Sequence, residues 1–186
     1  MKGTIQYLEN FKKLINEIDF KALEEIIRNL LEARHRNEIV FFIGNGGSAA
    51  TASHFAEDLA FCERSSSGES FRALSLNDSS PYMTAIANDF GYEDVFVKQL
   101  ENLYRDSDVL IVISASGNSI NLIKAVQYVN SRGGITIGIL GFDGGTLKNL
   151  CRHSLIVKTK KEQYGLVESM HGLLMHIIVN YFKTLT

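Results

Sequence analysis

Residues 38–62 contain the pattern that most restricts the fold of this chain. Residues 39–43 (IVFFI) form a short apolar run, typical of a buried parallel strand. The sequence GNGGS at residues 44–48 then turns the chain, and no glycine or proline follows before residue 64, so a helix of about four turns can form. A strand, a glycine turn and a helix N-terminus direct free N–H groups and the helix dipole at one place. We therefore expect a phosphate or another oxygen-rich group there.

Four more apolar runs predict strands, at residues 71–76, 109–113, 135–140 and 154–157, and helical patterns separate them. This alternation predicts an α/β fold: a doubly wound, five-stranded parallel sheet with helices on both faces, in a single domain of residues 1–186. In such sheets ligands bind at the carboxyl ends of the strands. The loops after the first and third strands have similar compositions and lie at that end.

The first 35 residues contain two amphipathic helical patterns ahead of the first strand. Asp19 lies between the two patterns and can cap the second helix. Two interpretations of this N-terminal extension have equal weight: the helices cover the sheet, or they form a contact between subunits.

Composition narrows the classes of partner. The net charge is −2, which provides no general attraction to nucleic acid or to an anionic membrane. The N-terminus has no apolar signal-peptide core, and no run approaches the roughly 18 apolar residues of a membrane span. Cys62 and Cys151 form no CxxC motif. We expect a cytoplasmic protein.

Residues 44–49 (GNGGSA) also fit the dinucleotide-binding pattern G-x-G-x-x-A. That pattern requires an acidic residue about 20 positions further on, at the end of the next strand. The nearest match is Asp78, 34 residues beyond Gly44. The spacing argues against a nicotinamide or flavin, and we expect no nucleotide cofactor.

The loop after the third strand is rich in hydroxyl groups. Ser114, Ser116 and Ser119 surround Gly117 at the start of a predicted helix. Hydroxyl and backbone N–H groups can bind phosphate without a lysine, whereas serine at such a position can also simply cap the helix. Two loops of this kind at one edge of the sheet favour phosphate binding.

Two predicted helices carry histidine and carboxylate residues at helical spacing. His54 and Asp58 are four residues apart in the helix after the glycine turn and flank its apolar stripe, whereas Glu57 falls nearly opposite that stripe and should be the more exposed carboxylate. In the last helix, Glu168 and His176 are two turns apart, with Gly172 between them. Histidine beside a carboxylate suits acid–base chemistry or metal binding, although a surface ion pair has the same spacing. His171 lies nearer the apolar stripe, which predicts a packed or hydrogen-bonded histidine.

The chain resembles the SIS-domain sugar isomerases in four motifs that occur in the same order: GNGGSAA…SHFAEDL, ANDFGYEDVF, ISASGNS and VESMHGLLMH. The resemblance extends over essentially the whole chain. It implies a flavodoxin-like sheet and a homotetramer with sites at subunit contacts. It also implies an aldose–ketose isomerase that converts sedoheptulose 7-phosphate to D-glycero-D-manno-heptose 7-phosphate through an enediol.

The resemblance also implies roles for single residues. The catalytic residues would be a carboxylate, Asp58 or Glu168, that moves the proton, and His176, which would shuttle protons at the oxygens. A zinc or other divalent metal site would consist of His54, Asp58, Glu168 and His176. The sugar phosphate would contact Asn45, Gly46, Gly47, Ser48, Asn88, Asp89, Ser114, Ser116, Ser119 and Glu168.

Three residues depart from the family's usual pattern. Asp58 replaces a glutamate, Glu168 replaces a glutamine, and Ala115 replaces a threonine in the serine loop. The departures leave open an alternative: a non-catalytic SIS protein that binds sugar phosphates, or an adaptor like the relative that associates with the bacterial replication initiator. His54 and His176 favour the enzyme, since an adaptor has no use for them.

Overall fold

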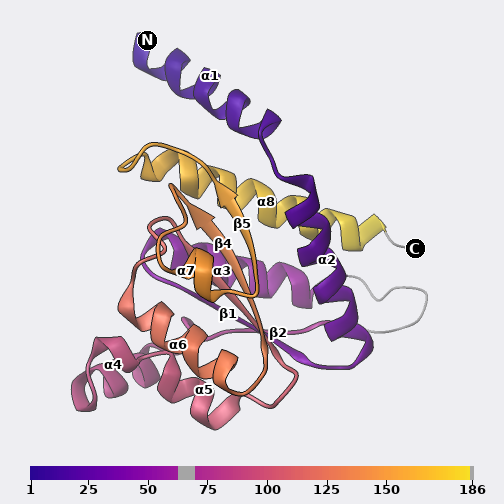
Figure 1. Cartoon of the computed structure of the whole chain (residues 1–186), viewed down its shortest axis with the longest axis vertical. Coiled ribbons are helices and arrows are strands. Elements are labelled where there is room, and N and C mark those ends of the chain that lie inside the picture. The colour runs from indigo at the N-terminus through magenta and orange to yellow at the C-terminus, as the bar shows by residue number, and fades with distance from the viewer. Residues whose placement is uncertain (63–69, 185–186) are drawn as a thin grey trace.

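The computed structural model describes residues 1–62 and 70–184, and a parallel sheet lies at its centre (Figure 1). The sheet has five strands in the order β2-β1-β3-β4-β5, which confirms the predicted doubly wound α/β fold. The order places β1 and β3 at the topological switch point, where such sheets bind ligands. The strands are β1 (Ile39–Gly44), β2 (Arg72–Ser75), β3 (Val109–Ser114), β4 (Ile135–Gly141) and β5 (His153–Val157).

The helices follow the predicted alternation. The helix after the glycine turn has the predicted length of about four turns and ends at Ala60, and the buried Val95 and Phe96 separate η1 from α5. The helices are α1 (Lys2–Asn16), α2 (Phe20–His35), α3 (Gly47–Ala60), α4 (Ser80–Asp89), η1 (Tyr92–Asp94), α5 (Val97–Leu103), α6 (Ile120–Ser131), α7 (Leu147–Leu150) and α8 (Tyr164–Thr184).

Alternate side chains of the strands enter two separate apolar cores. Phe42 of β1 faces α3, where its ring centroid lies 4.8 Å from that of Phe55. Its neighbour Phe41 points to the opposite face and lies 6.3 Å from the ring of Tyr104. The first core joins the sheet to α2, α3 and α8, and the second joins it to α5 and α6. Because α3 and α8 share one face, residues far apart in sequence meet between them.

The two N-terminal helices differ in how far they pack against the rest of the fold. Asp19 caps α2 as predicted, since its carboxylate accepts hydrogen bonds from the backbone N–H groups of Lys21 and Ala22. Helix α2 then packs Leu23, Ile26 and Leu30 into the first core. Helix α1 projects beyond the sheet (Figure 1) and buries only Leu14, while Ile5 and Leu8 are 53% and 55% exposed. Helix α2 therefore covers the sheet, whereas α1 leaves an apolar face uncovered.

In the part of the chain that the structure describes, no helix is both long and apolar enough to cross a membrane.

Candidate active site

The glycine turn after β1 has a backbone that only glycine permits. A side chain at Gly44 would place its Cβ 2.4 Å from the carbonyl oxygen of Ser48, and Gly46 has a φ of +56°. Asn77, which follows β2, fixes Gly44 from the side: its amide donates to the Gly44 carbonyl (2.9 Å) and accepts from the Gly44 N–H (3.1 Å). The turn is thus held in one conformation before α3 begins at Gly47.

Asn45, the only side chain of the turn between Gly44 and Gly46, makes long-range hydrogen bonds. Its amide pairs with that of Asn121 on α6, at 3.0 Å and 2.9 Å, and the hydroxyl group of Tyr92 donates to its Oδ1 atom at 2.9 Å. The glycine turn is therefore tied both to η1 and to the helix that follows the serine loop.

The hydroxyl groups of the serine loop after β3 differ in whether they make hydrogen bonds within the loop. The Ser114 hydroxyl accepts from the N–H of Gly117 at 3.0 Å, and that of Ser116 accepts from the N–H of Asn118 at 3.3 Å. Ser119 occupies the N-cap position of α6, but its side chain makes no capping hydrogen bond. Capping therefore does not account for Ser119, and its hydroxyl group remains available for a ligand.

The loop after β4 packs directly against the serine loop. A Cβ at Gly117 would lie 2.0 Å from the carbonyl oxygen of Gly144, so the two backbones are in direct contact. The N–H of Leu147 donates to the Gly117 carbonyl at 2.9 Å. Oδ1 of Asn118 accepts from both the backbone and the hydroxyl group of Thr146. These contacts fix the serine loop against the loop after β4.

Ala115, one of the three departures from the family pattern, has a packing role. It is buried in a small apolar cluster with Phe142 and Val167. A threonine there would bring a hydroxyl group into apolar surroundings, which costs free energy unless it finds a partner. The loss of this hydroxyl group leaves the hydroxyl groups of Ser116 and Ser119 in place.

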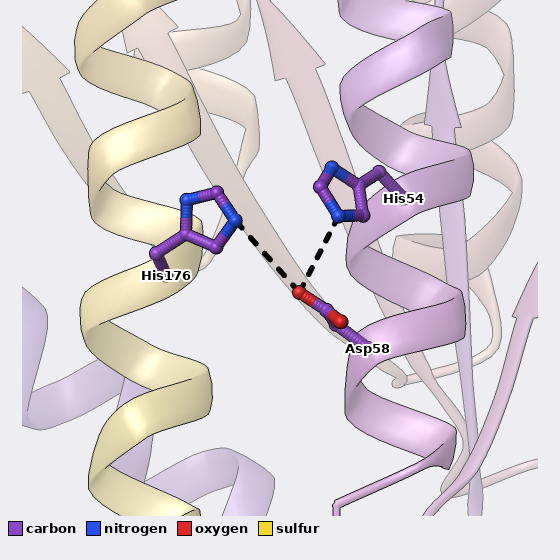
Figure 2. A group of neighbouring side chains, drawn as sticks. All are labelled: His54, Asp58 and His176. Carbon is purple, nitrogen blue, oxygen red and sulfur yellow. Dashed lines mark ion pairs between the residues drawn. The ribbon is translucent and has the colours of Figure 1, made fainter.

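Helices α3 and α8 lie side by side and run in the same direction. Residues early in α3 contact residues early in α8, and later residues of α3 contact later residues of α8. At the start of α3, the carboxylate of Glu168 lies against Gly47, so that a Cβ there would stand 2.6 Å from Oε1. Further along both helices, His54 and Asp58 face His176 (Figure 2). Asp58 lies about 16 Å along α3 from Gly47.

The cluster of His54, Asp58 and His176 could hold a metal ion. One ligand atom from each residue lies within 4.8 Å of the others. Oδ2 of Asp58 is 3.5 Å from Nε2 of His54 and 3.9 Å from Nε2 of His176. These distances exceed a normal hydrogen bond and are close to the separation of about 3.4 Å between two ligands of tetrahedral zinc. Two imidazoles and a carboxylate form a known catalytic zinc set, so these residues fit the metal.

Glu168 is not a member of this cluster, although the resemblance assigned it to the metal site. Its position against Gly47 places it about two helical turns from His176 along α8. The structure thus brings together three of the four expected ligands, and it places the fourth beside the glycine turn.

Comparison with known proteins identifies the family of the chain. The sequence model of the SIS domain matches residues 6–141. The chain is 36% identical over 177 residues to the phosphoheptose isomerase of a Nitratiruptor species, covering 95% of this chain and 92% of that protein. It is 37% identical over 180 residues to a phosphoheptose isomerase of Helicobacter pylori, covering 95% and 90%. The chain belongs to the SIS-domain family, among its phosphoheptose isomerases.

Solved structures of the same group have the same fold. The phosphoheptose isomerase of Neisseria gonorrhoeae is 28% identical to the chain, with a TM-score of 0.80 over 98% of this chain and 94% of that one. The structure from Francisella tularensis is 22% identical, and its TM-score of 0.87 over 98% and 97% shows the shared fold.

Asn88 and Asp89 lie at the end of α4 in this SIS-domain protein. Both are exposed, and the Asn88 amide donates to the carboxylate of Asp89 at 2.9 Å. Tyr92 follows three residues later and reaches Asn45, so this segment lies beside the glycine turn. The pair is thus exposed at the end of α4 that precedes η1.

His171 is a packed histidine, one of the two roles that its sequence position predicted. The side chain is 1% exposed, and neither ring nitrogen has a hydrogen-bond partner within normal limits. Burial lowers its pKa to about 4, and the Leu140 backbone acts weakly in the opposite direction. His171 is therefore neutral at physiological pH.

Sequence reasoning missed three polar residues that hold the loops: Asn77, Tyr92 and Asn121. Their partners are 33 to 76 residues away, so no periodic pattern could indicate them. Only the position of Tyr92 inside the ANDFGYEDVF motif offered a signal. Asp78, the nearest match to the acidic residue of the dinucleotide-binding pattern, accepts a hydrogen bond from the hydroxyl group of Ser53 at 2.5 Å.

Proposed function

We propose that the chain isomerises a phosphorylated sugar between its ketose and aldose forms, converting sedoheptulose 7-phosphate to D-glycero-D-manno-heptose 7-phosphate. The observation that carries the proposal is the arrangement along α3 and α8. Two phosphate-type loops lie at the carboxyl ends of β1 and β3, and a cluster of two histidines and a carboxylate lies further along the helices. Relatives that share over a third of their residues with the chain are phosphoheptose isomerases.

In this proposal the loops hold the substrate. The phosphate group binds the serine loop, where the hydroxyl group of Ser119 is not used for capping. The sugar contacts the glycine turn, with Asn88 and Asp89 facing its hydroxyl groups. The residues assigned to substrate binding are Asn45, Gly46, Gly47, Ser48, Asn88, Asp89, Ser114, Ser116, Ser119 and Glu168.

The chemistry moves one proton between neighbouring carbons. A carboxylate removes a proton from C1 of the ketose while O2 gains one, which gives an enediol. The same carboxylate returns a proton to C2, and O1 loses its proton to form the aldehyde. Asp58 and Glu168 are the two candidates for this carboxylate, and His176, 3.9 Å from Asp58, shuttles protons at the oxygens.

The residues His54, Asp58 and His176 would hold a divalent metal such as zinc. A bound metal supplies a Lewis acid that polarises the carbonyl group. Because Asp58 lies between the two histidines, metal binding would fix the Asp58 carboxylate in one orientation. Glu168 would then remain available beside Gly47.

We further propose that residues 1–186 form a single domain that assembles into a homotetramer in the cytoplasm. The uncovered face of α1 supports assembly, because exposed Ile5 and Leu8 would be buried in a subunit contact. The double variant Ile5→Asp, Leu8→Asp should lower the mass measured by light scattering, whereas an unchanged mass would exclude this face.

The direct test is conversion of sedoheptulose 7-phosphate by purified protein with added zinc, followed by NMR of the anomeric protons. Appearance of the aldose supports the proposal, and its absence overturns it. The non-catalytic adaptor is not favoured by the comparisons. Recovery of a replication initiator in a pull-down, together with no bound metal and no conversion, would reverse that ranking.

A further inference from the structure

Asn121 links the two loops at the switch point of the sheet. It lies in the first turn of α6 and is 2% exposed, so its amide is removed from water. That amide pairs with the amide of Asn45, which stands in the other loop. A buried amide is stable only when its groups have partners, so this pair constrains both loops.

The direction of the pair is fixed by the backbone. The N–H of Leu122, which also donates to the carbonyl of Ser119 at 3.1 Å, donates to a side-chain atom of Asn121 at 3.0 Å, and because an N–H group can only donate, that atom is Oδ1. Nδ2 of Asn121 must therefore be the atom that faces Asn45 Oδ1, at 2.9 Å. Rotation of either amide by half a turn would bring two oxygens or two N–H groups together.

With these hydrogen bonds formed, the only group that the Asn45 amide can still offer is one N–H donor. Its Oδ1 atom already accepts from Asn121 and from the hydroxyl group of Tyr92, which occupies both lone pairs. One N–H of its Nδ2 atom donates to Asn121. Within residues 1–62 and 70–184, the second N–H has no partner. Asn45 can consequently donate to a ligand but cannot accept from one.

We infer that Asn121 is a positioning residue that, together with Tyr92, presents the free N–H of Asn45 to an acceptor oxygen of the sugar phosphate. The inference rests on the proposed function for the identity of the ligand. It assigns Asn121 a role through Asn45 and no contact with the substrate. It also predicts selectivity for an acceptor oxygen, because a ligand group that can only donate would meet no acceptor at Asn45.

A double-mutant cycle in the isomerase assay tests this role. Asn121→Leu keeps a similar side-chain size, and it should lower kcat/KM about 10- to 100-fold, because Asn45 is free to rotate. In the Asn45→Ala background the same change should cost less than about twofold, since there is no amide left to position. An equal loss in both backgrounds would show a merely structural role and overturn the inference.

Asn130→Leu is the matched control. Asn130 is on the same helix and also makes side-chain hydrogen bonds, to the carbonyl of Leu150 and the hydroxyl group of Thr136, but it lies at the far end of α6. The Asn130→Leu variant should have a kcat/KM within about twofold of the native value. If Asn121→Leu does not fold, Tyr92→Phe replaces it, since Tyr92 is 54% exposed. Tyr92→Phe should cost about threefold or more in the native background and nothing in the Asn45→Ala background.

A readout that needs no activity separates this inference from the proposed function. The side-chain N–H of Asn45 that donates to Asn121, identified in a ¹⁵N spectrum by its loss in Asn45→Ala, should exchange hydrogen slowly. The exchange should become faster in Asn121→Leu and stay slow in Asn130→Leu. Unchanged exchange in Asn121→Leu would overturn the inference even for an active enzyme. Faster exchange in an inactive protein would preserve it while the proposed function fails.

Discussion

The carboxylate of Glu168 on α8 lies directly against Gly47 on α3, where a Cβ atom would stand 2.6 Å from Oε1 and 2.7 Å from Oε2. This contact places a negative group at the first residue of α3, where the helix dipole favours it. The absence of a side chain at Gly47 leaves room for this close approach. The departure from glutamine to glutamate at residue 168 is therefore compatible with its surroundings.

Replacement of Gly47 by alanine should displace Glu168 without unfolding the protein. The carboxylate is the end of a flexible side chain, so the stability should change by no more than about 1 kcal/mol. The value of kcat/KM should fall about tenfold or more, because Glu168 leaves the glycine turn. In a Glu168→Ala background, Gly47→Ala should have little further effect. A full loss in that background would mean that Gly47 acts independently of Glu168.

Asp58→Asn should abolish turnover and preserve the fold. The asparagine cannot accept a proton, and loss of a general base typically costs about 10²- to 10⁴-fold in kcat. Glu57→Gln is the matched control, because Glu57 is the neighbouring exposed carboxylate and lies outside the cluster. Parallel rate measurements and thermal melts on both variants check this prediction. Native turnover in Asp58→Asn would remove Asp58 from the base role and leave Glu168.

Zinc binding should depend most on the clustered residues. His54→Ala and His176→Ala should each weaken zinc binding at least about tenfold, since each removes one ligand of three. Glu168→Gln should weaken it less, because the carboxylate lies outside the cluster. Titration calorimetry of metal-free protein with zinc measures all three affinities. The ranking would be contradicted if Glu168→Gln had the largest effect, which would make Glu168 a ligand after all.

The buried His171 should make the fold sensitive to mild acid. Its pKa is about 4 in the folded state against 6.5 in the unfolded chain, so between these values the unfolded state binds one more proton. Stability therefore falls as pH decreases from 6.5 to 4, by about 3 kcal/mol from this group. His171→Leu should flatten this part of the curve in urea unfolding measured at a series of pH values. A curve as steep as that of the native protein would assign the loss to other groups.

The strands of the sheet were predictable because they depend on local patterns, whereas the strand order that creates the switch point depends on pairing between distant segments. Five apolar runs separated by helical segments define the strands, and glycine marks the turn after β1. The pairing of His54 with Asp58 also follows from spacing alone. The meeting of His176 with these residues, and of Glu168 with Gly47, depends on how α8 packs against α3, which no local pattern encodes. The Asn45–Asn121 pair is non-local for the same reason.

The role of α1 could not be decided from sequence because an amphipathic pattern shows only that one face is apolar. The pattern has the same form in α2, which buries that face, and in α1, which leaves most of it exposed. Val95 and Phe96, which separate η1 from α5, are buried in the second core, and their burial likewise depends on packing that no local pattern shows.

The most direct measurement is the reaction of sedoheptulose 7-phosphate with the native protein and zinc in deuterium oxide. Transfer through an enediol exposes the proton on the carboxylate to solvent, so deuterium should appear at C2 of the aldose product in its proton and carbon NMR spectra. Asp58→Asn and Glu168→Gln, run beside it, should show which carboxylate carries the proton. Absence of the aldose product would contradict the isomerase itself, and product that contains hydrogen alone at C2 would contradict an enediol whose proton exchanges with solvent.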